Sequence, residues 1–302
     1  DGRFSVNLGV AEVDVRVSVI PGNYGESFVM RLLDPRNAVT DLGKIAFPKK
    51  LREAIDYALK KPNGVILTTG PTGSGKTTTL YAFLHTSYSS EIKIITIEDP
   101  IEYHLDGITQ TQVDPKKGYT FVSGLRAALR QDPDIIMVGE IRDEDTAKVA
   151  INAALTGHLV FSTLHTNNAA GTIPRLIDLG INPKVIAGAL SLSLAQRLVR
   201  KLCPKCKVAY ETSEKETRVI TNILGDMKTS GKTESMLSHV PETTYTLFHA
   251  TGCEECSGSG YIGRIGIFEA VLMNAEVEKI LITNPSEREI MQASKNQGIP
   301  SL

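Results

Sequence analysis

The sequence predicts an α/β protein with a mostly parallel β-sheet that is covered by helices on both faces. Four apolar runs rich in β-branched residues are typical of buried parallel strands: residues 65–69, 92–97, 134–138 and 159–164. Helical spacing lies between them, most clearly at residues 145–155, which Gly157 follows. Strands and helices that alternate in this way favour a parallel sheet over an antiparallel one.

The first predicted strand leads into a glycine-rich loop, and a predicted helix follows. Gly70 to Thr77 matches the pattern G-x-x-x-x-G-K-[ST]. The glycines let consecutive backbone N–H groups converge on phosphate oxygens, and the helix N-terminus adds partial positive charge. We expect Lys76 to reach the β- and γ-phosphates, and the Thr77 hydroxyl to bind Mg²⁺. The predicted ligand is a nucleoside triphosphate with magnesium, bound by Gly70, Pro71, Thr72, Gly73, Ser74, Gly75, Lys76, Thr77 and Thr78.

Charged side chains follow the other predicted strands. Glu98 and Glu102 come at the end of the second run, Glu140 follows the third, and His165 ends the fourth. Nucleotide sites in such proteins lie at the carboxyl edge of the sheet, where these strand ends meet. A solvated strand end is the alternative for each acid taken singly. The nearby phosphate loop favours a shared site.

The N-terminal residues predict a different structure. Val13, Val15, Val17 and Val19 alternate with polar residues, which is typical of a half-buried strand, and strands are also expected near residues 4–10 and 28–33. Turn residues between these runs favour an antiparallel sheet. We predict that residues 1–40 are part of a small β-containing domain with its linker, and that residues 41–302 form the nucleotide-binding domain.

Composition and charge limit the possible classes of protein. The chain has 302 residues, of which 41% are hydrophobic, so it is long enough for one large domain or two smaller ones. Its formal charge of −1 gives no global field that would attract nucleic acid or an anionic membrane. No apolar run approaches the ~20 residues that span a bilayer, so we predict a cytosolic or peripheral protein. Because it starts at Asp1 without methionine and ends at Leu302, we interpret it as a fragment.

All four cysteines occur in two C-x-x-C pairs: Cys203 and Cys206, then Cys253 and Cys256. Two such pairs favour a structural zinc ion held by four thiolates, in a subdomain of about residues 200–265. Redox-active pairs and fortuitous cysteines are the alternatives. Between the pairs lies a polar insert, at about residues 211–245, that we expect to be partly disordered.

Six segments together resemble one family, the type II secretion and type IV pilus assembly ATPases, over nearly the whole chain. These segments, in the family's order, are residues 1–3, residues 13–16, the phosphate loop, residues 97–102, residues 125–134, and residues 156–166. The resemblance implies a RecA-like core that works as a ring of six subunits. It also implies an assembly-type member, because the retraction-type members lack the four cysteines.

The resemblance further implies roles for individual residues. Glu102 would orient or deprotonate the attacking water, Glu140 would act at the magnesium ion and the water, and His165 would sense the γ-phosphate. Glu98 belongs to the same acidic segment as Glu102. Arginines would come to the phosphates or line the subunit interface: Arg16, Arg31, Arg126 and Arg130. The implied partner is an inner-membrane platform protein, which would recruit a cytoplasmic ATPase to the membrane.

Two functions of other classes stay open at this stage. A nucleotide-binding scaffold could respond to ATP without hydrolysing it, although the intact Lys76, Glu102 and Glu140 argue against this reading. A nucleic-acid translocase could use the same core, but neutral charge and the lack of interleaved basic and aromatic residues disfavour direct nucleic-acid binding. The basic residues between 197 and 207 are interpreted as a solvated helix end.

Overall fold

The computed structural model describes residues 2–7, 9, 12–33, 41–229, 244–283 and 285–302. Its largest part is a seven-stranded sheet with the strand order β12-β9-β4-β8-β7-β5-β6. β12 runs antiparallel to β9, and the other neighbouring pairs are parallel, so the predicted mostly parallel sheet is confirmed. The strands are β4 (Gly64–Thr69), β5 (Ile94–Glu98), β6 (Thr109–Gln112), β7 (Ile135–Val138), β8 (Leu159–Leu164), β9 (Leu190–Leu202) and β12 (Tyr261–Leu272).

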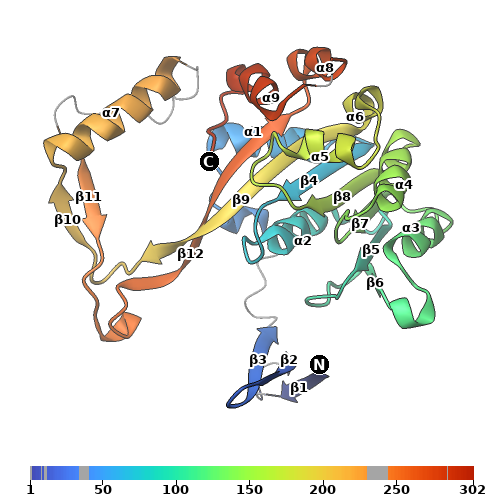
Figure 1. Ribbon diagram of the computed structural model, residues 1–302, viewed down its shortest axis with the longest axis horizontal. Helices are drawn as coiled ribbons and strands as arrows, with labels where there is room; N and C mark the ends of the chain where they lie inside the picture. Colours follow the sequence, from blue (N-terminus) through green and yellow to red (C-terminus); the bar gives the residue numbers. More distant parts are fainter. Residues whose placement is uncertain (1, 8, 10–11, 34–40, 230–243, 284) are drawn as a thin grey trace.

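Helices cover both faces of this sheet (Figure 1). Successive residues of a strand point to opposite faces, so Ile66 packs with α1 and α2, whereas Leu67 belongs to the core cluster on the other face. The helices are α1 (Lys49–Leu59), α2 (Lys76–Ser87), α3 (Phe121–Leu129), α4 (Glu144–Leu155), α5 (Thr172–Asp178), α6 (Pro183–Ala189), α8 (Ala275–Leu281) and α9 (Glu287–Ala293). Short 3-10 turns lie at Leu42–Lys44, Pro115–Lys117, Glu254–Cys256 and Lys295–Gln297.

The packing between α2 and β8 shows what holds the centre of the sheet in place. Phe83 and Phe161 are fully buried, and their rings meet edge to face with centroids 6.0 Å apart. Truncating either ring to alanine would cost about 3–5 kcal/mol, because the lost contacts leave a cavity. The helix that carries the phosphate loop is therefore firmly attached to the sheet.

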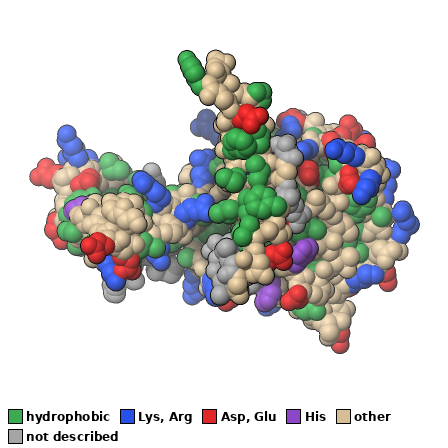
Figure 2. All heavy atoms as spheres, turned by 90° about the horizontal axis from the view of Figure 1, so that it is seen from below, with side chains coloured by type: hydrophobic (Ala, Val, Ile, Leu, Met, Phe, Trp, Pro, Cys, Tyr) green, Lys and Arg blue, Asp and Glu red, His purple; other side chains and the backbone are tan. Residues whose placement is uncertain are grey.

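A separate three-stranded antiparallel sheet forms the N-terminal part, as predicted, from β1 (Gly2–Asn7), β2 (Glu12–Gly22) and β3 (Gly25–Leu33). One face is apolar: Val15 lies opposite Phe4 and Leu32, and Val17 lies opposite Met30. Much of this apolar face is exposed, and Figure 2 shows hydrophobic side chains gathered there. The other face carries Arg16. The predicted domain boundary at residue 40 lies outside the described residues.

β9 and β12 extend beyond the large sheet and carry the four cysteines at their far end (Figure 1). A two-stranded sheet and a helix complete this region: β10 (Val208–Glu211), β11 (Thr246–His249) and α7 (Glu214–Thr229). Part of the polar insert is thus helical, while residues 230–243 lie outside the described residues. No helix in the described part of the chain is long and apolar enough to cross a membrane.

The interpretation of the basic residues as a solvated helix end is wrong. Arg197 and Arg200 are exposed and lie within strand β9, where antiparallel pairing with Ile267 and Arg264 of β12 fixes an extended backbone. The guanidinium of Arg200 packs over the ring of Tyr261, 3.9 Å from its centroid. The residues are therefore part of a strand of the large sheet.

Candidate functional site

The phosphate loop joins β4 to α2, as the sequence predicts, and glycines shape both of its ends. Gly70 has a φ of +135°, and a Cβ there would lie 2.3 Å from the carbonyl oxygen of Gln196 on β9. Gly75 has a φ of +90° and immediately precedes α2. Other residues rarely adopt these φ values, so a side chain at either position would strain the loop. Gln196 also supports the loop directly, because its Nε2 donates to the carbonyl oxygen of Ser74 at 2.6 Å.

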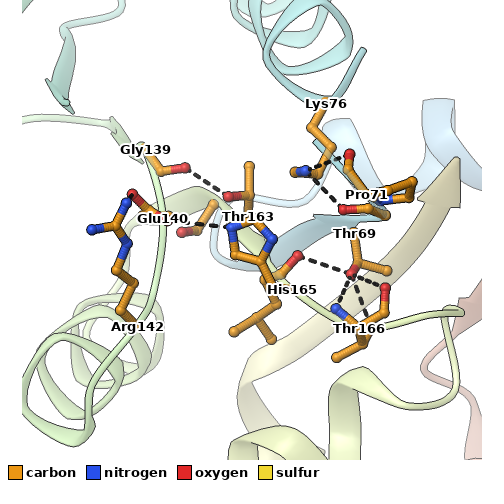
Figure 3. A network of polar contacts seen from close by, with 12 residues as sticks. Thr69, Pro71, Lys76, Gly139, Glu140, Arg142, Thr163, His165 and Thr166 are labelled. Atoms are coloured by element: carbon orange, nitrogen blue, oxygen red, sulfur yellow. Dashed lines mark hydrogen bonds and ion pairs between the residues drawn. The ribbon is translucent and has the colours of Figure 1, made fainter. Parts of the chain in front are cut away.

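Lys76 turns its ammonium back onto the loop. Its Nζ donates to the carbonyl oxygens of Gly70 at 2.8 Å and Pro71 at 3.1 Å (Figure 3). Partial burial lowers the pKa of Lys76, and the nearby charges of Glu140 and Glu102 oppose that shift. The ammonium is therefore held where phosphate oxygens would replace the two carbonyl oxygens as acceptors.

One cavity brings together residues that are far apart in the sequence. Lys76 and Thr77 lie on one side of it, at the start of α2. The carboxyl ends of β5 and β7 supply acidic groups, and the N-terminal sheet supplies two arginines. The charged residues lining the cavity are Arg16, Arg31, Lys76, Glu98, Asp99, Glu102 and Glu140. An oxygen-rich donor set beside a hydroxyl suits Mg²⁺, and the cations suit phosphate oxygens.

Glu140 contacts two basic side chains that follow neighbouring strands. Its Oε1 lies 2.5 Å from Nη2 of Arg142, and its Oε2 lies 3.4 Å from Nε2 of His165 (Figure 3). The hydrogen bond to Glu140 raises the pKa of Arg142. The sequence analysis assigned no role to Arg142. Its place two residues after Glu140, in the loop that follows β7, was the available signal.

Arg16 connects the N-terminal sheet to the acidic segment of the large sheet. Its Nη2 donates to the carbonyl oxygen of Ile101 at 2.8 Å, next to Glu102. Arg31 lies directly opposite Arg16 on the neighbouring strand β3. Like charges directly opposite each other on a sheet repel, and an anion placed beside both would relieve that repulsion. The arrangement is therefore suited to a phosphate group.

The predicted roles of Arg126 and Arg130 have less support in the geometry. Both lie on or just after α3 and are exposed. Among the described residues that line the cavity, neither arginine occurs. Within one chain, then, the structure does not bring these two arginines together with Lys76 and Glu140, and their predicted role stays a prediction.

Glu98 differs from the other acids because its carboxylate is buried and hydrogen-bonded within the protein. The Tyr81 hydroxyl, Thr96 Oγ1 at 2.5 Å and Gln110 Nε2 at 3.1 Å all donate to it. Burial raises the pKa of Glu98, and the hydrogen bonds from Thr96, Tyr81 and Gln110 oppose that shift. Although Glu98 lines the cavity, it also links the elements behind it.

The four cysteines meet at the end of the β9–β12 extension, with their sulfur atoms all within 4.8 Å of one another. Sγ–Sγ distances are 3.9 Å between Cys203 and Cys253, 3.8 Å between Cys206 and Cys256, and 3.7 Å between Cys253 and Cys256. Four thiolates bound to zinc at about 2.3 Å form a tetrahedron with edges of about 3.8 Å. A disulfide needs about 2.05 Å instead, so the cluster fits a metal ion.

Two backbone amides donate to one sulfur atom of the cysteine cluster. The N–H groups of Cys253 and Gly260 both donate to Sγ of Cys256, each at 3.1 Å. Hydrogen bonds of this kind favour the charged thiolate, which is the form that binds metal. The four sulfur atoms use every corner of a tetrahedron, so the site is closed in the manner of a structural metal site.

Known proteins resemble the chain over its full length. A family model described as "Type II/IV secretion system protein" matches residues 1–302. Type II secretion system protein E of Pseudomonas aeruginosa is 47% identical over 302 residues, which are 100% of this chain and 57% of that protein. The type IV pilus assembly ATPase PilB of Myxococcus xanthus is 42% identical, over 100% of this chain and 51% of that protein. The chain thus spans slightly more than half the length of these relatives.

A solved structure gives the same picture of the fold. The crystal structure of the pilus retraction motor PilT with bound ADP matches with a TM-score of 0.61 and 26% sequence identity. The match covers 100% of this chain and 76% of that one. This likeness, together with the strand order described above, confirms the predicted RecA-like core.

Proposed function

The chain belongs to the type II/IV secretion system protein family, and we propose that it is the Mg²⁺-dependent ATPase motor of a type II secretion or type IV pilus assembly machine. One observation carries this proposal. The cavity at the phosphate loop combines Lys76 and Thr77 with three glutamates of the large sheet and two arginines of the small sheet. That set contains the groups needed to hold a triphosphate, to position water, and to stabilise negative charge in a transition state.

Lys76 and the loop amides bind the phosphates in this proposal. When ATP enters, the Lys76 ammonium exchanges the carbonyl oxygens of Gly70 and Pro71 for phosphate oxygens. The Thr77 hydroxyl and the carboxylate of Glu140 would hold magnesium, which neutralises charge on the β- and γ-phosphates. Because the loop is braced by Gln196, it needs little rearrangement when the nucleotide binds.

Glu102 is the residue that we assign to the attacking water. It lines the cavity and follows the segment whose Ile101 carbonyl oxygen accepts from Arg16. A carboxylate in that place can orient the water and accept its proton. His165 follows the neighbouring strand β8, contacts Glu140 and is the candidate sensor of the γ-phosphate.

Arg16 and Arg31 supply positive charge from a sheet that is separate from the one bearing Lys76. Phosphoryl transfer gains most from charge placed where the transition state is negative. Hydrolysis would then depend on the orientation of the small sheet relative to the large sheet. This dependence can couple the chemical step to movement.

The motor would act as a ring, proposed to have six subunits. The exposed arginines of α3, Arg126 and Arg130, would reach a neighbouring subunit rather than their own cavity. A ring uses one heterologous interface repeatedly, so each cavity can be completed by the next chain. The motor would work in the cytoplasm, recruited to the membrane by an inner-membrane platform protein.

We assign zinc to Cys203, Cys206, Cys253 and Cys256 as a structural ion. The cluster lies at the far end of the β9–β12 extension, away from the phosphate loop (Figure 1). Its role in the proposal is to fold the end of that extension, where no apolar side chain is buried in the described strands β10 and β11.

A phosphate-release assay with Mg²⁺ and ATP tests the proposal. We expect turnover that requires both and that is lost in Lys76→Ala. ATP binding without phosphate release in the intact chain would instead favour a nucleotide-responsive scaffold. Turnover that depends on added DNA or RNA would favour a translocase.

A further inference from the structure

Behind the cavity, a buried network links the helix of the phosphate loop to the segment that follows Glu102. Its centre is the Glu98 carboxylate, which accepts from three side chains on three different elements. Tyr81 comes from α2, five residues after Lys76. Gln110 comes from β6, at the edge of the sheet. Tyr81, Thr96 and Gln110 do not line the cavity, so the network lies behind it.

Gln110 holds the segment after Glu102 by both ends of its amide. Its Nε2 donates to the carbonyl oxygen of Tyr103 at 3.2 Å as well as to Glu98. Its Oε1 accepts from the backbone N–H of Leu105 at 2.7 Å. The backbone just beyond Glu102 is therefore fixed to the same carboxylate that accepts from Tyr81.

Tyr81 contacts this segment from the other side. Its ring meets the ring of Tyr103 edge to face, with centroids 4.7 Å apart. Burial and the Glu98 carboxylate raise the pKa of Tyr81, while a hydrogen bond from the backbone of Glu102 opposes the shift. The hydroxyl of Tyr81 donates to the carboxylate of Glu98, while its ring contacts Tyr103, the residue after Glu102.

We propose that Tyr81 and Gln110 are positioning residues, which act through the buried Glu98 to set where the Glu102 carboxylate stands relative to Lys76. The proposal rests on the function assigned above to Glu102. It adds that the phosphate-binding helix and the water-orienting segment are aligned by side-chain hydrogen bonds. An error of about 1 Å in such an alignment can cost about 100-fold in rate.

Tyr81→Phe is the sharpest test, because it removes one hydroxyl and keeps the ring contact with Tyr103. We expect kcat to fall about tenfold, while the affinity for ATP changes less than about twofold, since Lys76 and the loop stay intact. Tyr119→Phe is the matched control. Its hydroxyl donates to Thr111 on the same strand β6 at 2.8 Å but does not touch Glu98, and its kcat should stay near that of the wild type.

The decisive measurement is single-turnover phosphate release in four chains: wild type, Tyr81→Phe, Glu102→Gln and the double variant. A residue that acts through Glu102 should cost nothing further once that carboxylate is gone. Equal tenfold losses in both backgrounds, or a wild-type rate in a folded Tyr81→Phe, would overturn the proposal.

Gln110→Met supplies a second, independent variant if Tyr81→Phe does not fold. It removes both hydrogen bonds to the segment at similar volume, and it should show the same loss of kcat with unchanged ATP affinity, again absent in the Glu102→Gln background. A folded Gln110→Met with wild-type kcat would contradict the proposal. If Glu102→Gln alone keeps wild-type turnover, the assigned function of Glu102 fails, and that result is separate from any effect of Tyr81 or Gln110.

Discussion

The two walls of the nucleotide cavity are built in different ways. The wall with Lys76 and Glu140 is the edge of a seven-stranded sheet in which β4, β5, β7 and β8 are buried at every position. The wall with Arg16 belongs to a three-stranded sheet whose buried apolar side chains, among the described residues, are those of Val13 and Val15. The first wall is fixed by its own core, whereas little buried area holds the second. In the proposed function, the binding charge of Lys76 and the catalytic charge of Arg16 therefore lie on parts of the chain that differ greatly in their buried apolar side chains.

If the two walls differ in this way, replacing Lys76 in the wall of the large sheet should abolish nucleotide binding. We expect Lys76→Ala to abolish most triphosphate affinity and to reduce turnover at least about tenfold, because its ammonium is the cation that the loop supplies to the phosphates. Isothermal titration and phosphate release measure the two effects. Lys50→Ala, an exposed lysine on α1, serves as the control. Turnover above about a tenth of wild type would show that the loop is not the essential wall.

Glu102→Gln, on the same wall, should reduce ATP hydrolysis without preventing ATP binding. The amide keeps the shape of the carboxylate but cannot take a proton, so we expect hydrolysis to fall about 100-fold or more while ATP still binds. Kd and kcat measured on the same preparation make the comparison, with Glu53→Gln on α1 as the control. Equal losses in both quantities would remove Glu102 from the catalytic role.

Damage to the second wall should affect turnover more than affinity. Arg16→Ala removes a guanidinium that lines the cavity and donates to Ile101. We expect kcat to fall about tenfold or more with a smaller change in Kd, because charge from this wall acts mainly on the transition state. Arg218→Ala, an exposed arginine on α7, is the matched control. A loss of affinity with unchanged kcat would instead make the small sheet a part of the binding wall.

Substitutions in the cysteine cluster are expected to affect the two walls of the cavity least. Purified protein should carry about one zinc per chain, and Cys203→Ser with Cys253→Ser should release it and destabilise the end of the β9–β12 extension. Lys76 should still bind ATP. Elemental analysis and thermal unfolding with two probes test this. Less than about a third of an equivalent of zinc, or four freely titrating thiols, would leave the cluster unexplained.

The sequence analysis predicted best where the functional pattern was contiguous. The phosphate loop was recognised because strand, glycines, lysine and helix follow one another within about 20 residues. The rule that parallel strands end at one sheet edge led us to expect Glu102, Glu140 and His165 near one another. In the structure, Glu102 and Glu140 line the cavity, and His165 contacts Glu140. The four cysteines carried their own spacing, and the structure places them together as predicted.

What could not be predicted depends on contacts across the fold. Nothing near Gln110 in the sequence shows that it holds the Glu102 segment, because Thr109–Gln112 is polar and becomes a strand only by pairing with β5. Strand β9 was missed although Leu190, Leu192 and Leu194 alternate with serines, a period-two signal that was available. The opposition of Arg16 and Arg31 depends on the register of a hairpin, which the spacing of these residues alone does not fix.

The central claim is that the two walls of the cavity hydrolyse ATP together only when subunits assemble into a ring. It is tested most directly by ATPase activity per subunit, measured against protein concentration, for the wild type and Arg16→Ala. In the proposed function, a lone subunit would hold ATP through the loop, but its catalytic charge would depend on how the small sheet is oriented within a ring. The account predicts activity that rises with concentration in the wild type and stays low and flat in the variant. Constant activity per subunit down to nanomolar protein that is demonstrably monomeric would contradict it.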